Sequence, residues 1–91
     1  MTDSDHLAQF RRALAWLLTC CDRRRELNLR STSYGLKHQV EHAMRAAGER
    51  GIYVSNGMFI AAALTLGFRV EQIARTPNAW TNAFPRREAR R

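Results

Sequence analysis

Apolar residues recur every three or four positions at the start of the chain, which predicts an amphipathic helix over about residues 6–27, capped by Asp5. The stripe consists of Leu7, Phe10, Leu14, Leu17, Leu18 and Cys21. Trp16 lies on the opposite side of this helix, flanked by Arg12 and Arg23. This second face favours either burial in the core or in a homodimer, or an exposed indole that stacks on a base or a protein partner.

A second helix is predicted over about residues 34–47, after a polar break, and Gly48 ends it. Its apolar positions are Leu36, Val40, Ala43, Met44 and Ala47. On the other face Lys37, Glu41 and Arg45 lie four residues apart, which is typical of a solvated ladder of ion pairs without chemistry.

The segment 52–54 is short, β-branched and aromatic, and it predicts an extended connector or a single short strand. A third helix follows from Ser55 or Asn56, apolar almost all round and therefore expected to be the most buried, and Gly67 ends it. Residues 69–76 predict a fourth helix of two turns, which Pro77 stops.

The third and fourth helices have the spacing of a helix-turn-helix unit, which needs a small residue, a glycine four positions later and apolar residues beyond it. Ala63, Gly67, Phe68 and Ile73 fill these positions. The residues expected to reach nucleic acid from this unit are Arg69, Gln72, Arg75 and the following Asn78. An ordinary helical hairpin with a glycine cap produces the same spacing without DNA.

Near the C-terminus, Trp80 and Phe84 lie four residues apart and are expected to anchor the chain on the bundle. The basic residues that follow predict a flexible tail over residues 86–91, with Arg86, Arg87, Arg90 and Arg91 as phosphate contacts. The sequence therefore predicts one all-α domain, a compact four-helix module over residues 1–85, followed by this tail.

The net charge of the chain indicates which kinds of molecule the protein could bind. The 91 residues carry 15 Lys and Arg against 8 Asp and Glu, a formal net charge of +7, which favours nucleic acid or another anionic partner. Only Lys37 is a lysine, and arginine suits phosphate and guanine edges better than an ammonium group does. No apolar run reaches the roughly 20 residues of a membrane span, and the start of the chain is acidic rather than signal-like. We expect a cytoplasmic protein that does not contact membranes.

Catalytic and metal-binding patterns are weak. His38 and His42 lie four apart, and Cys20 and Cys21 are adjacent, which makes them poor joint ligands of one zinc ion. The sequence contains no glycine-rich phosphate loop and no hydrolase-type serine motif. We therefore expect a protein that is not an enzyme and uses no metal or cofactor.

Three segments resemble one family of small proteins encoded by phages, plasmids and integrative elements. The likeness covers about residues 33–84 and is carried by Tyr34-Gly35-Leu36-Lys37-His38, by Tyr53-Val54-Ser55-Asn56-Gly57-Met58-Phe59-Ile60-Ala61-Ala62-Ala63, and by Gly67-Phe68 with Pro77-Asn78-Ala79-Trp80. The resemblance implies a mobile-element origin, and with it either control of the element's own DNA or inhibition of a host defence complex, as anti-CRISPR proteins do.

The leading hypothesis is nucleic-acid binding through the helix-turn-helix-like unit and the tail. The alternative is an inhibitor that docks on a host nucleoprotein complex, with Trp16 or Trp80 as anchors and Arg12 and Arg23 beside them.

Overall fold

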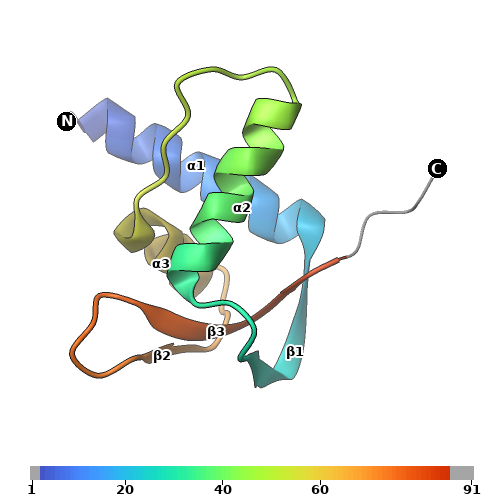
Figure 1. Ribbon diagram of the computed structural model, residues 1–91, viewed down its shortest axis with the longest axis vertical. Helices are drawn as coiled ribbons and strands as arrows, with labels where there is room; N and C mark the ends of the chain where they lie inside the picture. Colours follow the sequence, from blue (N-terminus) through green and yellow to red (C-terminus); the bar gives the residue numbers. More distant parts are fainter. Residues whose placement is uncertain (1–2, 87–91) are drawn as a thin grey trace.

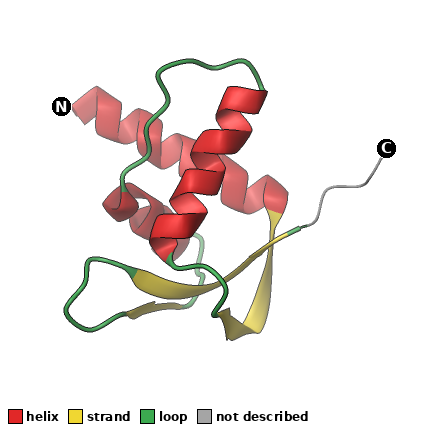
Figure 2. Cartoon of the chain, in the orientation of Figure 1, coloured by secondary structure: helices red, strands yellow, loops and turns green. Residues whose placement is uncertain are grey.

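The computed structural model describes residues 3–86, which form three helices and a three-stranded antiparallel sheet (Figure 1). The elements in chain order are α1 (Asp3–Cys20), β1 (Cys21–Asn28), α2 (Ser33–Ala46), α3 (Asn56–Thr65), β2 (Val70–Gln72) and β3 (Ala79–Pro85). Figure 2 shows the helices gathered on one side of the sheet. The prediction of an all-α four-helix module is therefore wrong.

The first helix ends at Cys20, and the chain continues as a strand instead of about two further helical turns. The apolar repeat stops at Cys21, because only charged residues follow until Leu27. The partner of β1 is β3, with Cys21 opposite Pro85. This pairing joins segments about sixty residues apart, so the local sequence carries no sign of it.

The predicted fourth helix is a hairpin made of β2, a turn and β3, in which Val70 pairs with Thr81. Arg75 has a φ of 67°, a left-handed conformation that no helix interior allows. The Gln72 side chain donates hydrogen bonds to the carbonyl oxygens of Thr76 and Asn78 and so closes the turn. The helix-turn-helix unit is absent from the described residues, because the element that would read the groove is this turn.

β3 is the central strand, in the order β1-β3-β2. Ala79, Thr81 and Ala83 are completely buried, and they alternate with side chains that point to the other face of the sheet. Trp80 and Phe84 lie on that second face and are half-buried. The small buried residues let the helices approach the sheet closely.

Asn82, also on the second face, holds both edge strands to the centre. Its amide donates to the carbonyl oxygen of Arg24 in β1, and its oxygen accepts from the backbone N–H of Arg69, just before β2. The pairing of β1 with β3 is irregular between Arg23 and Asn28. Five residue steps of β1 span the two steps of β3 from Ala83 to Thr81, so β1 carries a bulge at this point.

The core lies between the three helices and the sheet. Its buried residues include Ala13, Trp16, Leu17, Leu36, Val40, Val54, Phe59, Ala62, Ala63, Phe68 and Ala83. α1 turns its Trp16 and Leu17 inward, whereas Leu7 and Leu18 of the predicted stripe are exposed. α3 is not buried all round either, because Leu64 is exposed.

α3 begins and ends on local signals. The Ser55 hydroxyl accepts a hydrogen bond from the Met58 N–H, which satisfies one donor of the first turn. Gly67 follows the helix with a φ of 82°, and a Cβ there would lie 3.1 Å from a guanidinium nitrogen of Arg23. Among residues 3–86 no helix combines the length and the apolar character needed to cross a bilayer.

Candidate nucleic-acid interface

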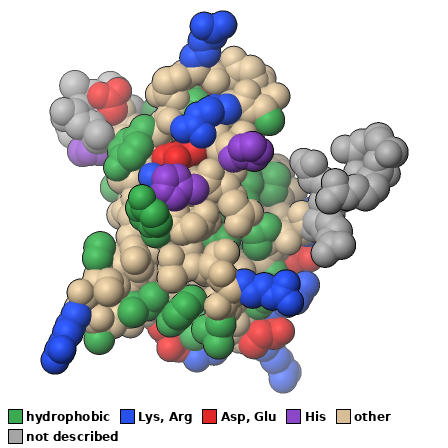
Figure 3. Space-filling view, viewed as in Figure 1, with side chains coloured by type: hydrophobic (Ala, Val, Ile, Leu, Met, Phe, Trp, Pro, Cys, Tyr) green, Lys and Arg blue, Asp and Glu red, His purple; other side chains and the backbone are tan. Residues whose placement is uncertain are grey.

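Three arginines line an open cleft of about 800 Å³ between β1 with the turn that follows it, the middle of α2 and the end of β3. They are Arg24, Arg30 and Arg86, and Phe84 and Asp22 lie among them. Three cationic groups against one carboxylate leave the lining with an excess of positive charge. In Figure 3, Lys and Arg side chains are seen at the lower right of the molecule, where β1 lies in Figure 1.

Arg24 is the best-positioned of these arginines. Its guanidinium carbon lies 4.3 Å from the centre of the Phe84 ring, so cation and ring are in direct contact. The arginine side chain is exposed and has no ion-pair partner within residues 3–86. Phe84 thus holds the Arg24 guanidinium against the wall of the cleft. The face of the guanidinium that points away from the ring can receive an anion or a flat ring.

Arg86 belongs to the fold rather than to a free tail. Its Nε donates to Asp22 at 2.9 Å, and its two terminal nitrogens donate to the carbonyl oxygens of Thr19 and Cys21, each at 3.2 Å. These bonds tie the end of β3 to the junction of α1 and β1. The guanidinium is exposed but fixed, whereas Arg87, Arg90 and Arg91 lie outside the described residues.

Arg30 stands in the turn after β1 and is exposed. Asn28 shapes this turn, because its oxygen accepts from the Arg30 N–H at 3.0 Å and its amide donates to Ala83 at 2.9 Å. The Arg30 guanidinium itself makes no hydrogen bond or ion pair within residues 3–86. It is therefore available to an anionic ligand.

The structure does not bring the predicted base-reading residues together. Arg69 pairs with Glu71 and donates to the carbonyl oxygen of Arg25. Its guanidinium is therefore occupied by contacts with neighbouring residues of the protein. Gln72 closes the hairpin turn, and the Asn78 side chain accepts a hydrogen bond from Asn56 at 3.0 Å. Arg75 is exposed in the turn of the hairpin and has no ion-pair partner among residues 3–86.

The predicted partner-binding residues do not share a surface either. Trp16 is only 4% exposed and packs on Phe59 with ring centres 6.2 Å apart. Of the two environments expected for this indole, it therefore has the buried one. Arg12 pairs with Glu49 at 3.4 Å. Arg23 donates to Leu66 at the end of α3, and Trp80 lies on the far face of the sheet. No stacking platform is formed by Trp16 with its flanking arginines.

Lys37 and Glu41 form a buried ion pair on α2, and the sequence did not predict its burial. The ammonium nitrogen of Lys37 lies 3.0 Å from Glu41, and both side chains are about 5% exposed. The rings of Tyr34 and Tyr53 lie 5.2 and 4.8 Å from that nitrogen. The interpretation of Lys37 and Glu41 as part of a solvated ladder of ion pairs is wrong, because the two tyrosines cover the lysine. In the sequence, the only sign of this burial is the presence of the two tyrosines.

Glu41 accepts hydrogen bonds from three directions. Besides Lys37, the backbone N–H of Val54 donates to it at 3.0 Å, and His38 lies 3.0 Å from its second oxygen. Burial by itself raises the pKa of Glu41. The bonds from Val54 and Lys37, with the charge of Lys37, outweigh that effect and hold the pKa below its ordinary value.

A lowered pKa makes Glu41 a source of acid sensitivity. Its contribution to stability is full above the ordinary value of 4.5 and is lost as the pH falls through the lower value of the folded state. We expect thermal melts from about pH 6 to about pH 3 to show a loss of stability that is smaller in Glu41→Gln. Identical pH profiles for the two proteins would contradict this.

Cys21 is not a reactive thiol. Burial, followed by the proximity of Cys20, raises the pKa of the Cys21 thiol to about 12, so it stays protonated and is a weak ligand and nucleophile. His38 is engaged by Glu41. Within the described part of the chain no three His, Cys, Asp or Glu side chains are grouped so as to hold a metal ion.

No protein-family model, curated protein or solved structure matches this chain. The function is therefore inferred from the fold and the cleft. Of the features described, the arginine cleft combines positive charge, an aromatic ring and open volume in one place.

Proposed function

We propose that this protein binds single-stranded nucleic acid in the arginine cleft. The observation that carries the proposal is the guanidinium of Arg24, held on the Phe84 ring beside Arg30 and Arg86 in one open cleft. Phosphates are recognised by arginines, and bases stack on guanidinium planes and on aromatic rings. A single strand offers both groups at once.

A single strand suits this surface better than a duplex does. The cleft is concave, and Arg24 and Arg30 lie on a strand and a turn along its wall, whereas a groove reader needs an element that projects into the duplex. Unpaired bases can turn towards the wall of a cleft while their phosphates remain at its rim. The formal charge of +7 adds a long-range attraction for such a strand.

A cytoplasmic site of action is part of the proposal. Both cysteines of the chain are free thiols, and Cys21 is buried. Reduced cysteines are the rule in that compartment.

The proposal is tested with the double variant Arg24→Ala/Arg30→Ala and a labelled single-stranded oligonucleotide, followed by fluorescence anisotropy. We expect the affinity at low salt to fall roughly tenfold or more, because two phosphate contacts are lost. The slope of log K against log salt should flatten by about 1.4, since each phosphate contact contributes about 0.7 on a single strand.

The matched control is Arg11→Ala/Arg50→Ala, which removes the same charge from two exposed arginines outside the cleft. It should lose much less affinity than the cleft variant. Equal losses would mean that net charge alone attracts the strand, and no binding by the unmodified protein would refute the proposal outright.

Docking on a protein of a host defence complex is the second candidate, and the exposed tyrosines on α2 and the 52–54 segment favour it. Tyr34 is 51% and Tyr53 48% exposed, and Lys37 holds both rings in place. Tyrosines are frequent anchors of protein interfaces. Binding to such a partner should survive an increase in salt that abolishes nucleic-acid binding, and Tyr34→Ala/Tyr53→Ala should weaken it selectively.

A further inference from the structure

A second cavity adjoins the arginine cleft. It has a volume of about 700 Å³ and lies between α1, α2 and the end of β3. Gln39, Pro85 and Arg86 line both spaces, so the cavity and the cleft meet along these three residues. A ligand in one of them can therefore continue into the other.

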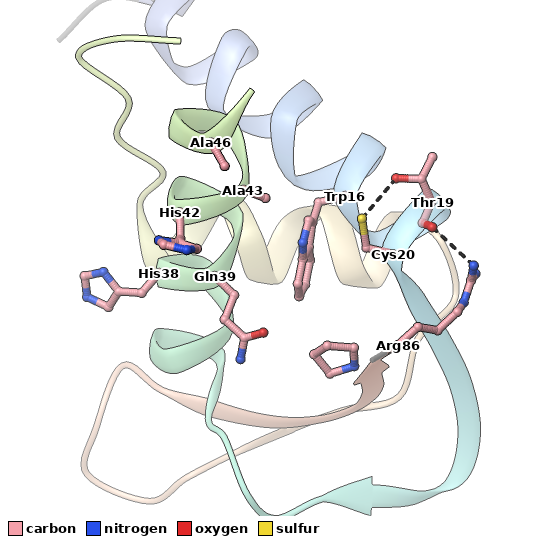
Figure 4. A pocket seen from close by; sticks show the side chains of 10 residues that line it. Trp16, Thr19, Cys20, His38, Gln39, His42, Ala43, Ala46 and Arg86 are labelled. Carbon is pink, nitrogen blue, oxygen red and sulfur yellow. Dashed lines mark hydrogen bonds between the residues drawn. The ribbon is translucent and has the colours of Figure 1, made fainter. Parts of the chain in front are cut away.

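The walls of this cavity are largely apolar. Trp16 and Cys20 come from α1, Ala43 and Ala46 from α2, and Pro85 closes the far end. Figure 4 shows Trp16 and Gln39 projecting from the two helices into the space between them. The packing of Trp16 on Phe59 keeps this wall in place, so the cavity does not depend on a mobile side chain.

Polar groups stand at the edges of the cavity. The exposed amide of Gln39 offers a donor and an acceptor side by side, which is the arrangement that pairs with the edge of a nucleobase. The Arg86 guanidinium is fixed by Asp22, Thr19 and Cys21 at the boundary with the cleft. An apolar cavity beside a cationic cleft matches a ligand with a heteroaromatic ring next to a phosphate.

We propose that this cavity receives one unstacked base of a bound single strand, whose flanking phosphates lie in the arginine cleft. This inference rests on the proposed function and adds where a base is held. Gln39 contacts the edge of the base, Ala43 and Ala46 border it on the α2 side, and Arg86 marks the passage to the phosphate. The cleft supplies attraction by charge, and the cavity supplies a preference for bases over bare backbone.

The test compares a short single-stranded DNA with an abasic strand of the same length, which has the same phosphates but no bases. Unmodified protein should bind the strand with bases roughly tenfold or more tightly than the abasic one. Ala46→Trp places an indole at the mouth of the cavity and should bring this ratio close to one, while binding of the abasic strand persists. Gln39→Ala should lower the ratio several-fold.

Ala15→Trp is the control, because Ala15 is exposed on α1 outside the cavity, and it should keep the ratio of the unmodified protein. Equal affinity of the unmodified protein for the two strands would overturn the inference and leave the proposed function standing. A ratio that neither Ala46→Trp nor Gln39→Ala lowers would overturn it too. Failure to bind either strand would instead refute the proposed function, and the inference with it.

Discussion

Replacing Glu41 with Ala should lower the free energy of unfolding by about 3–5 kcal/mol. The substitution leaves the buried ammonium of Lys37 without a carboxylate and the backbone N–H of Val54 without an acceptor. Because a domain of this kind has only about 5–15 kcal/mol of stability, much of the protein should unfold near body temperature. Chemical denaturation followed by circular dichroism measures the effect.

The double variant Lys37→Met/Glu41→Gln separates the pair's charge from its packing. It removes both charges, keeps an oxygen for the Val54 N–H and retains an apolar stem between Tyr34 and Tyr53. Replacing a whole buried pair is often close to neutral, so this variant should be clearly more stable than Glu41→Ala. A cost below about 1 kcal/mol for Glu41→Ala would show that the pair is not buried as described.

Trp16→Ala should destabilise the protein by about 3–5 kcal/mol, at least as much as Leu17→Ala, for which about 2–5 kcal/mol is expected. Both side chains are buried, at 4% and 1% exposure, and each substitution leaves a cavity in one continuous core. Thermal melts give the two losses of stability.

Light scattering on the same two variants decides whether Trp16 has a further role. A core residue should affect stability without changing the molecular mass in solution. If Trp16→Ala instead melted like the unmodified protein but had lost a dimer or a binding partner, the placement of Trp16 in the core would be wrong.

The second and third helices were predictable because their signals are local. α2 begins after Thr32, whose hydroxyl accepts from the Gly35 N–H, and α3 begins after Ser55 in the same way. The predicted bounds of the α2 helix, about 34–47, differ from Ser33–Ala46 by one residue at each end. Caps and glycine stops depend on a few neighbouring residues, and the sequence contains all of them.

The strands were not predictable from local patterns. β1 carries a run of charged residues that resembles the polar end of a helix, and β3 buries Ala79, Thr81 and Ala83, which are too small or too polar to resemble a buried strand. The apparent fourth helix rested on Val70 and Ile73 after the Gly67 turn and on Pro77 as its stop, and a spacing of three also fits a strand and its turn. The two edge segments become strands only through their pairing with β3, which is distant from β1 in the sequence.

The candidate site was predictable in kind but not in place. An excess of arginine indicated an anionic partner, and Arg86 was expected to take part. Arg24 was missed because β1 was interpreted as helix, and Arg30 was missed because it falls in the polar break that follows. The cleft exists only after β1, the middle of α2 and the end of β3 are brought together.

The most direct test of the central claim is an NMR titration of the protein labelled with ¹⁵N, with a short single-stranded oligonucleotide as ligand. If the strand binds in the arginine cleft, we expect the largest changes in backbone amide shifts at Arg24, Arg30, Gln39 and around Phe84. The hairpin turn at Arg75, which is also basic and exposed, should change little. Changes centred on Tyr34 and Tyr53, changes spread evenly over all basic residues, or none at all would contradict binding in the arginine cleft.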